Sequence, residues 1–368
     1  MALKDEIEKQ STQIKTDSYQ MSIGELLNLY RDDELDVHPE FQRVYRWTST
    51  QKTRLIESIL LGIPIPPIFV AQRADGVWDV VDGVQRLSTI FEFVGVLKGE
   101  DGQFIPPLVL EKTRFLPSLE GCKWEDGTKF AKENQLYIKR SKIDVKIVLK
   151  ESDDKSKYEL FMRLNTGGSP LTAQEVRNCL MLMAYPKAYD WIKSLSVDAG
   201  FQNTIALSDN DKEEQYAMEL VTRFLTFRTM PQEKLAEIVD IGDFLDNSLE
   251  NLHGIAKDDT RRTNEEQAFR ETFRVLDEAM QDEAFRRYHK DRGRFGGPFS
   301  TASFEVIAMG VGYNFTEQGT FPFEVNEISE KVKSVWSNPI FNKYSGAGVR
   351  ASNRIPKIIP VGRELFSK

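Results

Sequence analysis

The sequence is poor in the residues that build disulfide frameworks and thiolate metal centres. Its 368 residues include two cysteines, Cys122 and Cys179, and three histidines, His38, His253 and His289. Two cysteines cannot form a disulfide framework or a four-thiolate zinc site. None of the three histidines lies in an HExxH motif or a similar cluster. The composition therefore excludes a disulfide-stapled scaffold and the common histidine-rich metal motifs.

Long hydrophobic runs are also missing. The longest uncharged apolar stretch, residues 59–71, is too short to span a bilayer and contains three prolines. The N-terminus, MALKDEIEKQ, is charged and has no apolar signal core. We therefore predict a cytoplasmic protein with reduced thiols and no membrane segment.

Basic residues are fewer than acidic residues. Lys and Arg number 49 against 57 Asp and Glu, which gives a formal net charge of −8 and a sequence pI of about 5.3. This excess of acidic residues argues against a protein that coats DNA through its overall charge. It does not exclude a local basic groove, because binding depends on where the charges lie. Hydrophobic residues make up 40% and charged residues 29%, a globular balance, and the length predicts two domains.

Capping boxes and apolar periodicity predict the elements of the first half. Helices are expected to start at the boxes 22–25, 48–51 and 172–175. Strands are expected at 68–70, 77–81 and 143–149, with a hairpin turn at 74–76. The helix after Asp82-Gly83 is expected to bury five apolar residues at helical spacing: Leu87, Ile90, Phe91, Val94 and Leu97.

From about residue 200 the pattern becomes helical. Apolar periodicity is clear in residues 213–228, 264–285 and 301–313. We therefore predict an α+β fold. Its expected parts are a polar lead-in, a mixed domain, and a helical domain with a basic C-terminal tail: residues 1–20, 21–185 and 186–368.

The segment Val80-Val-Asp-Gly-Val-Gln-Arg86 is the clearest candidate for a binding site. A strand ends, Gly83 turns the chain, and a helix begins with Arg86 in its first turn. Unpaired first-turn N–H groups and the helix dipole favour an anion. Gly83 allows an oxyanion to approach the backbone, Arg86 can bind phosphate through two hydrogen bonds, and Asp82 can hold a metal ion or position water. In the structural alternative, Asp82 only caps the helix and Arg86 pairs with it or a neighbour.

A second polar segment covers residues 38–47. Gln42 and Arg43 stand beside aromatic residues, and this combination suits a nucleotide through stacking and charge. The structural alternative is an ordinary segment in which Arg46 stacks on Trp47.

A third polar segment covers residues 161–172. A helix stop followed by a capped helix start explains its glycines. That explanation accounts less naturally for Arg163 and Asn165.

Together, the stretches QRVYRW, DGVQR and FMRLNTGGSPLTAQEVRN resemble the DGQQR-motif domain of GmrSD-type restriction systems over residues 20–185. Relatives of that family include SspE-type defence proteins. The resemblance implies an N-terminal core similar to the ParB/sulfiredoxin fold. It also implies a nucleotide-phosphate site at the DGQQR turn, associated with NTP binding or hydrolysis in anti-phage defence.

Carried over by position, the resemblance predicts an NTPase whose catalytic residues are Asp82, Gln85 and Arg86, with Gly83 in the nucleotide-binding turn. The implied ligands are a nucleoside triphosphate and Mg²⁺, with Asp82 as the candidate metal ligand. Four residues match the family's QR and RLN motifs and are predicted to bind the nucleotide: Gln42, Arg43, Arg163 and Asn165.

The sequence departs from the family in two places. The first glutamine of DGQQR is Val84 here, and a valine cannot hydrogen-bond a phosphate, a base or a water. Hydrolysis is expected to be slow if that side chain acts in the chemistry, and unaffected if it packs. Full-length relatives often carry an HNH nuclease domain, but after residue 185 only His253 and His289 remain. The resemblance is thus to a stand-alone GmrS-like half, with a separately encoded HNH-type nuclease as its partner.

Two other functions stay open. A DNA-sensing or adaptor module is suggested by basic residues near the C-terminus, and the predicted nucleic-acid-binding residues are Arg350, Arg354 and Lys357. A metal-dependent nuclease is suggested by the D-x-K pattern of Asp144-Val-Lys146, with Asp79 or Asp82 as a second carboxylate. The same pattern is also typical of one exposed face of an alternating strand.

Overall fold

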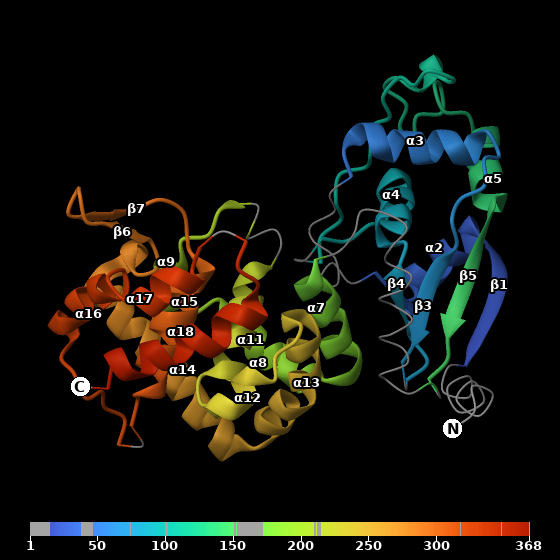
Figure 1. Cartoon of the computed structure of the whole chain (residues 1–368). Coiled ribbons are helices and arrows are strands. Elements are labelled where there is room, and N and C mark those ends of the chain that lie inside the picture. Colours follow the sequence, from blue (N-terminus) through green and yellow to red (C-terminus); the bar gives the residue numbers. More distant parts are fainter. Residues whose placement is uncertain are drawn as a thin grey trace, which may run out of the picture. The chain divides into compact units, whose positions relative to one another are not determined.

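The computed structural model describes ten segments of the chain: residues 15–37, 47–73, 75–99, 102–150, 152, 172–209, 211, 215–316, 318–346 and 348–367. The chain divides into two units, residues 1–183 and 184–368. The first contains a five-stranded mixed sheet with helices, and the described part of the second is helical apart from a short hairpin (Figure 1). The predicted α+β fold is confirmed. No described helix is long and apolar enough to cross a bilayer.

The sheet of the first unit has the strand order β1-β5-β3-β4-β2 (Figure 1). β3 pairs with β4 antiparallel and with β5 parallel, and β1 closes one edge antiparallel to β5. The three strands expected from the sequence are confirmed to within two residues. The bounds are β1 (Thr16–Ser22), β2 (Leu35–Asp36), β3 (Ile68–Gln72), β4 (Trp78–Asp82) and β5 (Lys142–Val148).

The helices of the first unit begin where the capping boxes predict. Ser22 accepts a hydrogen bond from the amide of Glu25, and Thr48 and Gln51 form both bonds of their box. At residues 172–175 the third box is also formed by two reciprocal hydrogen bonds. The bounds are α2 (Ile23–Arg31), α3 (Ser49–Leu60), α4 (Val84–Val94), α5 (Lys132–Arg140) and α7 (Ala173–Ala184).

β3 and β4 are buried on both faces of the sheet. Val70 and Val80 belong to the main core, together with residues of α2, α3 and α4. Ala71 and Val81 instead cluster with Val176 of α7. Because side chains alternate along a strand, neighbouring residues serve opposite faces, and a strand covered on both faces is apolar throughout. The turn that follows β4 is therefore anchored in a strand that is packed on both sides.

Two sequence predictions were wrong in this unit. Residues 16–20 are not a polar lead-in but part of β1, an edge strand whose first five residues are exposed and therefore show no apolar alternation. The helix after Gly83 ends at Val94 rather than at Leu97, because Gly95 adopts a φ of +80° and terminates it. Leu97 is nevertheless buried.

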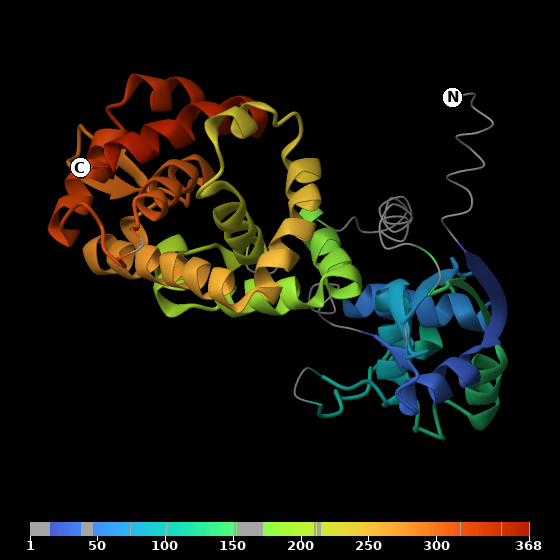
Figure 2. The same cartoon turned by 90° about the horizontal axis from the view of Figure 1, so that it is seen from below.

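The second unit is built from helices that enclose a core rich in phenylalanine. The helices expected at 213–228, 264–285 and 301–313 are confirmed as α11, α14 and α15, and Figure 2 shows the long α14 along one side of the unit. A small hairpin, not expected from the sequence, joins α14 to α15. The bounds are α8 (Pro186–Ser196), α9 (Ala199–Ile205), α11 (Tyr216–Phe227), α12 (Gln232–Ala236), α13 (Ile241–Lys257), α14 (Asp259–Met280), β6 (Arg287–His289), β7 (Arg294–Gly296), α15 (Thr301–Tyr313), α16 (Ile328–Val335), α17 (Pro339–Tyr344) and α18 (Ala351–Leu365).

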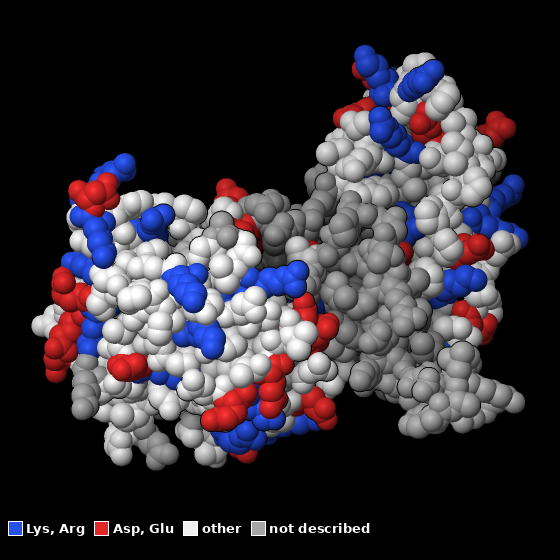
Figure 3. All heavy atoms as spheres, in the orientation of Figure 1, with Lys and Arg blue, Asp and Glu red and all other residues white. Residues whose placement is uncertain are grey.

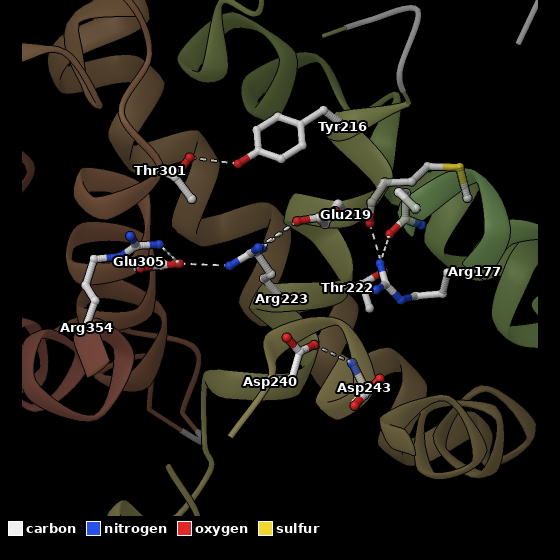
Figure 4. Close-up of polar contacts among 12 residues, drawn as sticks. Arg177, Tyr216, Glu219, Thr222, Arg223, Asp240, Asp243, Thr301, Glu305 and Arg354 are labelled. Atoms are coloured by element: carbon white, nitrogen blue, oxygen red, sulfur yellow. Dashed lines mark hydrogen bonds and ion pairs between the residues drawn. The ribbon is translucent and has the colours of Figure 1, made fainter. Parts of the chain in front are cut away.

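α15 is the central helix of this unit, since residues 302–312 are all buried. It packs closely against α18, where Gly310 and Gly362 let the two backbones approach. One buried residue of α15 is charged: Glu305 is fully inaccessible and pairs with Arg223 and Arg354 (Figure 4). The segment expected as a basic tail is thus a helix of the core, held by packing and by an internal ion pair.

Candidate functional site

The candidate site lies at the turn between β4 and α4. Asp82 is the last residue of β4, and the register of β3 and β4 shifts directly beside it, between Phe69 and Val70. Such irregularities are common next to binding sites. Gly83 follows with a φ of +100° and precedes the first residue of α4, with no side chain capping the helix. Gly83 has no side chain with which to cap the first-turn amides of α4, and these amides carry partial positive charge at the turn.

Gly83 is required at this turn by conformation and by space. A Cβ there would lie 2.5 Å from Cγ2 of Ile68, closer than any real contact. At Gly76, in the β3–β4 hairpin, φ is also positive (+95°), but no described atom lies within 4 Å of an added Cβ. An alanine would therefore have an unfavourable backbone conformation at both positions. Only at Gly83 would its Cβ also clash with a neighbouring side chain.

We expect Gly83→Ala to destabilise the first unit more than Gly76→Ala, by about 1–3 kcal/mol, the usual cost of overpacking. The measurement is the free energy of unfolding of both variants in urea. Equal losses would contradict the assigned contact with Ile68.

Arg86 is held against the turn by two partners. Its Nη2 donates to Oδ2 of Asp82 at 2.7 Å, and its Nη1 donates to the carbonyl of Pro66 at 2.9 Å. The Arg86 side chain is 11% exposed and that of Asp82 is 33% exposed. The structural alternative predicted an ion pair between Asp82 and Arg86, and this pair is present. It also predicted that Asp82 caps the helix, which is wrong, because Gly83 occupies the N-cap position.

The two residues between Gly83 and Arg86 have different surroundings. Val84 is 4% exposed and belongs to the main core, so the departure from DGQQR is a packed side chain. Gln85 accepts a hydrogen bond through Oε1 from the amide of Trp47 at 3.3 Å. This bond joins the turn to the chain that follows the QRVYR stretch.

The other predicted nucleotide-binding residues cannot be placed against this turn. They lie outside the described residues: Gln42, Arg43, Arg163 and Asn165. Sequence reasoning missed two backbone groups that are part of the site, the carbonyl of Pro66 and the amide of Trp47. The prolines 64, 66 and 67 predict the end of a helix, but they do not predict that a carbonyl among them binds Arg86. A backbone group can make such a bond whatever its residue type, so the sequence does not indicate it.

The carboxylates of the nuclease alternative are dispersed. Asp144 is exposed on β5, in the alternating pattern expected of a strand with one solvent face. Asp79 lies in an ion pair with Arg73, which also binds Asp36. Among the described residues, no group of three or more His, Cys, Asp or Glu is placed to hold a metal ion.

The three predicted nucleic-acid-binding residues have two different environments. Arg350 and Lys357 are exposed and line the same cavity beside α18. Arg354 instead binds Glu305 through Nε at 2.6 Å and Nη2 at 3.0 Å. Arg363, a further basic residue of α18, donates from Nη2 to the last carbonyls around the end of α11.

The arrangement at the turn suits an anion with several oxygens. The amides of the first turn and the dipole of α4 supply partial positive charge. Arg86 adds a guanidinium whose position is already fixed by Asp82 and Pro66, so little freedom is lost when a ligand binds. Asp82 is the nearest carboxylate and can share a cation with such a ligand.

The comparison with protein families matches residues 23–182, less than half of the chain, to the family described as GmrSD restriction endonuclease, N-terminal domain. The match contains all three stretches that carry the resemblance in the sequence. No curated protein matches the chain.

Proposed function

We propose that the protein binds and hydrolyses a nucleoside triphosphate in a restriction or anti-phage system, because residues 23–182 match the family described as GmrSD restriction endonuclease, N-terminal domain. The family supports a place in such a system. The nucleotide activity is our own proposal, and the turn from Asp82 to Arg86 is its site.

The observation that carries the proposal is a helix start at a glycine, which has no capping side chain, beside a guanidinium that two partners hold in place. The N-cap residue of α4 is Gly83, which accepts no hydrogen bond through a side chain, and Arg86 lies over it, with Nη2 3.3 Å from the position of an added Cβ. Amides at a helix start and a guanidinium both bind phosphate oxygens. Developing charge on a transferred phosphoryl group would be stabilised by the same donors.

Asp82 and Gln85 complete the proposed chemistry. Mg²⁺ is usually bound by one or two carboxylates together with substrate phosphates, so a single carboxylate beside a phosphate site fits the donor set. A carboxamide can donate and accept hydrogen bonds, and Gln85 is proposed to orient the attacking water. Because Val84 packs in the core, the missing glutamine removes no group from the surface of this turn.

The proposed partner is a separately encoded nuclease of the HNH type. In such a pair, nucleotide hydrolysis by this chain would activate DNA cleavage by the nuclease. Co-purification of the two products, with cutting that depends on NTP, is the direct check of that part.

The proposal is tested by Arg86→Ala, which we expect to lower kcat/KM for NTP hydrolysis by about 10²- to 10³-fold, the usual loss when one transition-state donor is removed. Arg86→Lys keeps the charge but loses the bidentate fork, and is expected to lie between wild type and alanine. Arg140→Ala, at an exposed position at the end of α5, is the matched control and should be unchanged.

The measurements are phosphate release and the melting temperature of each variant with each of the four NTPs and Mg²⁺, since a ligand of the native state raises the melting temperature. A wild-type protein that neither hydrolyses nor is stabilised by any NTP would overturn the proposal. So would an Arg86→Ala variant that turns NTP over at the wild-type rate.

A further inference from the structure

A second candidate site lies entirely in the helical unit, in a cavity of about 780 Å³ next to α17 and α18. Its volume is in the range of ligand pockets, about 300–1,000 Å³. The polar residues of its lining are Lys343, Tyr344, Arg350, Ser352, Asn353 and Lys357, and no Asp or Glu takes part. A lining of three cations without a carboxylate is unusual in a chain with a net charge of −8.

The three cations have no acidic partner in the part of the chain that the structure describes. Lys343, Arg350 and Lys357 are all exposed, and none forms an ion pair there. Two other basic residues of the same unit behave differently: Arg354 pairs with Glu305, and Arg274 pairs with two glutamates. Unpaired cations around a concave surface raise the local potential above that of a solvated surface.

The backbone adds to the positive potential of this cavity. Gly348, with a φ of +83°, brings the chain to Arg350, the residue that precedes α18. The residue before this 15-residue helix, Arg350, makes no side-chain cap within the described residues, and Ser352 in the first turn lines the cavity. The dipole of α18 therefore points its positive end toward the same space as the three cations. Figure 3 shows Lys and Arg side chains over this face of the unit, around α15 and α18, where Asp and Glu are sparse.

We propose that this cavity binds the phosphate group of a ligand. Compact ammonium groups and a guanidinium fork are the side chains that bind phosphate, and Ser352 and Asn353 can donate further hydrogen bonds. The source of the phosphate is the backbone of DNA or a free nucleotide, which share this chemistry. The site is separate from the turn at Arg86 and does not depend on the function proposed for it.

The test compares two double variants of the full chain that lose the same charge. Arg350→Ala/Lys357→Ala removes two cations of the cavity, and Arg262→Ala/Arg274→Ala removes two ion-paired cations of α14 that lie outside the cavity lining. Fluorescence anisotropy with a labelled duplex of about 20 base pairs gives the DNA affinity and its salt dependence. The melting temperature with inorganic pyrophosphate or ATP gives binding of a free phosphate ligand.

If DNA supplies the phosphate, the cavity variant is expected to bind the duplex about 10-fold more weakly. Its slope of log K against log salt is expected to fall by about 1.8, since each neutralised phosphate contributes about 0.9. If a nucleotide supplies it, Arg86→Ala keeps the part of the thermal shift that comes from the cavity, and the cavity variant loses that part. A cavity variant that matches the α14 variant in both assays overturns the proposal, as does a wild-type protein that binds neither ligand.

Discussion

Replacing Glu305 by alanine is expected to lower the free energy of unfolding of the helical unit by about 3–5 kcal/mol, the cost of removing one partner from a buried ion pair. Glu305 is fully buried in α15, a helix that is otherwise almost entirely apolar. Its Oε1 accepts from Arg223 at 2.8 Å, and both its oxygens accept from Arg354 (Figure 4).

The expected loss is large because two cations would stay behind in the core. Burial lowers the pKa of Arg223, but the charges of Glu219 and Glu305 outweigh it and raise the pKa above its usual range. The guanidinium therefore remains charged and must be balanced. After Glu305→Ala, Glu219 balances Arg223 only, and Arg354 has no described carboxylate left.

The matched control is Glu278→Ala. Glu278 accepts from Arg274 at 2.9 Å, a comparable distance, but both side chains are more than half exposed. Exposed ion pairs contribute about 0–1 kcal/mol, so the control should remain near wild type in a urea titration followed by circular dichroism. A loss at Glu305 as small as that at Glu278 would show that the buried charges are relieved by water or by rearrangement.

Replacing Gly362 by alanine is expected to cost at least about 3 kcal/mol, at the upper end of overpacking, although alanine favours a helix over glycine by about 1 kcal/mol. A Cβ at Gly362 would lie 1.9 Å from the carbonyl oxygen of Val306. A Cβ at Gly310, on the other side of this crossing, would lie 2.6 Å from the backbone of Gly362. Because the obstacles are backbone atoms, α15 and α18 would have to separate.

Gly254→Ala is the control that isolates helix propensity from the clash. Gly254 lies in α13, is exposed, and has no described atom within 4 Å of an added Cβ. Alanine should stabilise the protein there by about 0.5–1 kcal/mol. Opposite signs for the two substitutions are the expected result in thermal or urea unfolding. A stabilising Gly362→Ala would contradict the close approach of the two helices.

Much of the fold was predictable because the signals are local. The box Thr48 to Gln51 needs two hydrogen bonds within four residues, and it is formed as expected. The strand β5 shows its alternation in residues 142–147. β1 was not predictable, because a polar edge strand is stabilised by its partner β5 and not by its own pattern. The end of α4 was also misjudged, since Leu97 keeps the helical spacing while Gly95 stops the helix.

The candidate site was predictable in its residues but only partly in its contacts. Gly83 and Arg86 were identified from a strand, a glycine and a helix start, and the structure places them together at that turn. The contacts of Arg86 with the carbonyl of Pro66 and of Gln85 with the amide of Trp47 come from segments 20 and 38 residues away in the sequence. Such long-range backbone partners are fixed by packing and have no signature in the residue types.

The sequence by itself determined the α+β class, the resemblance of residues 23–182 to a known family and the position of the candidate turn, because capping, periodicity and short motifs act over a few residues. Only the tertiary structure decided what the C-terminal basic residues do. Arg354 and Arg363 bind groups of other helices, while Arg350 and Lys357 line a cavity without a carboxylate. Basic residues of the same charge along α18 therefore have different environments. The reason is that the neighbours on each face of α18 come from distant parts of the chain.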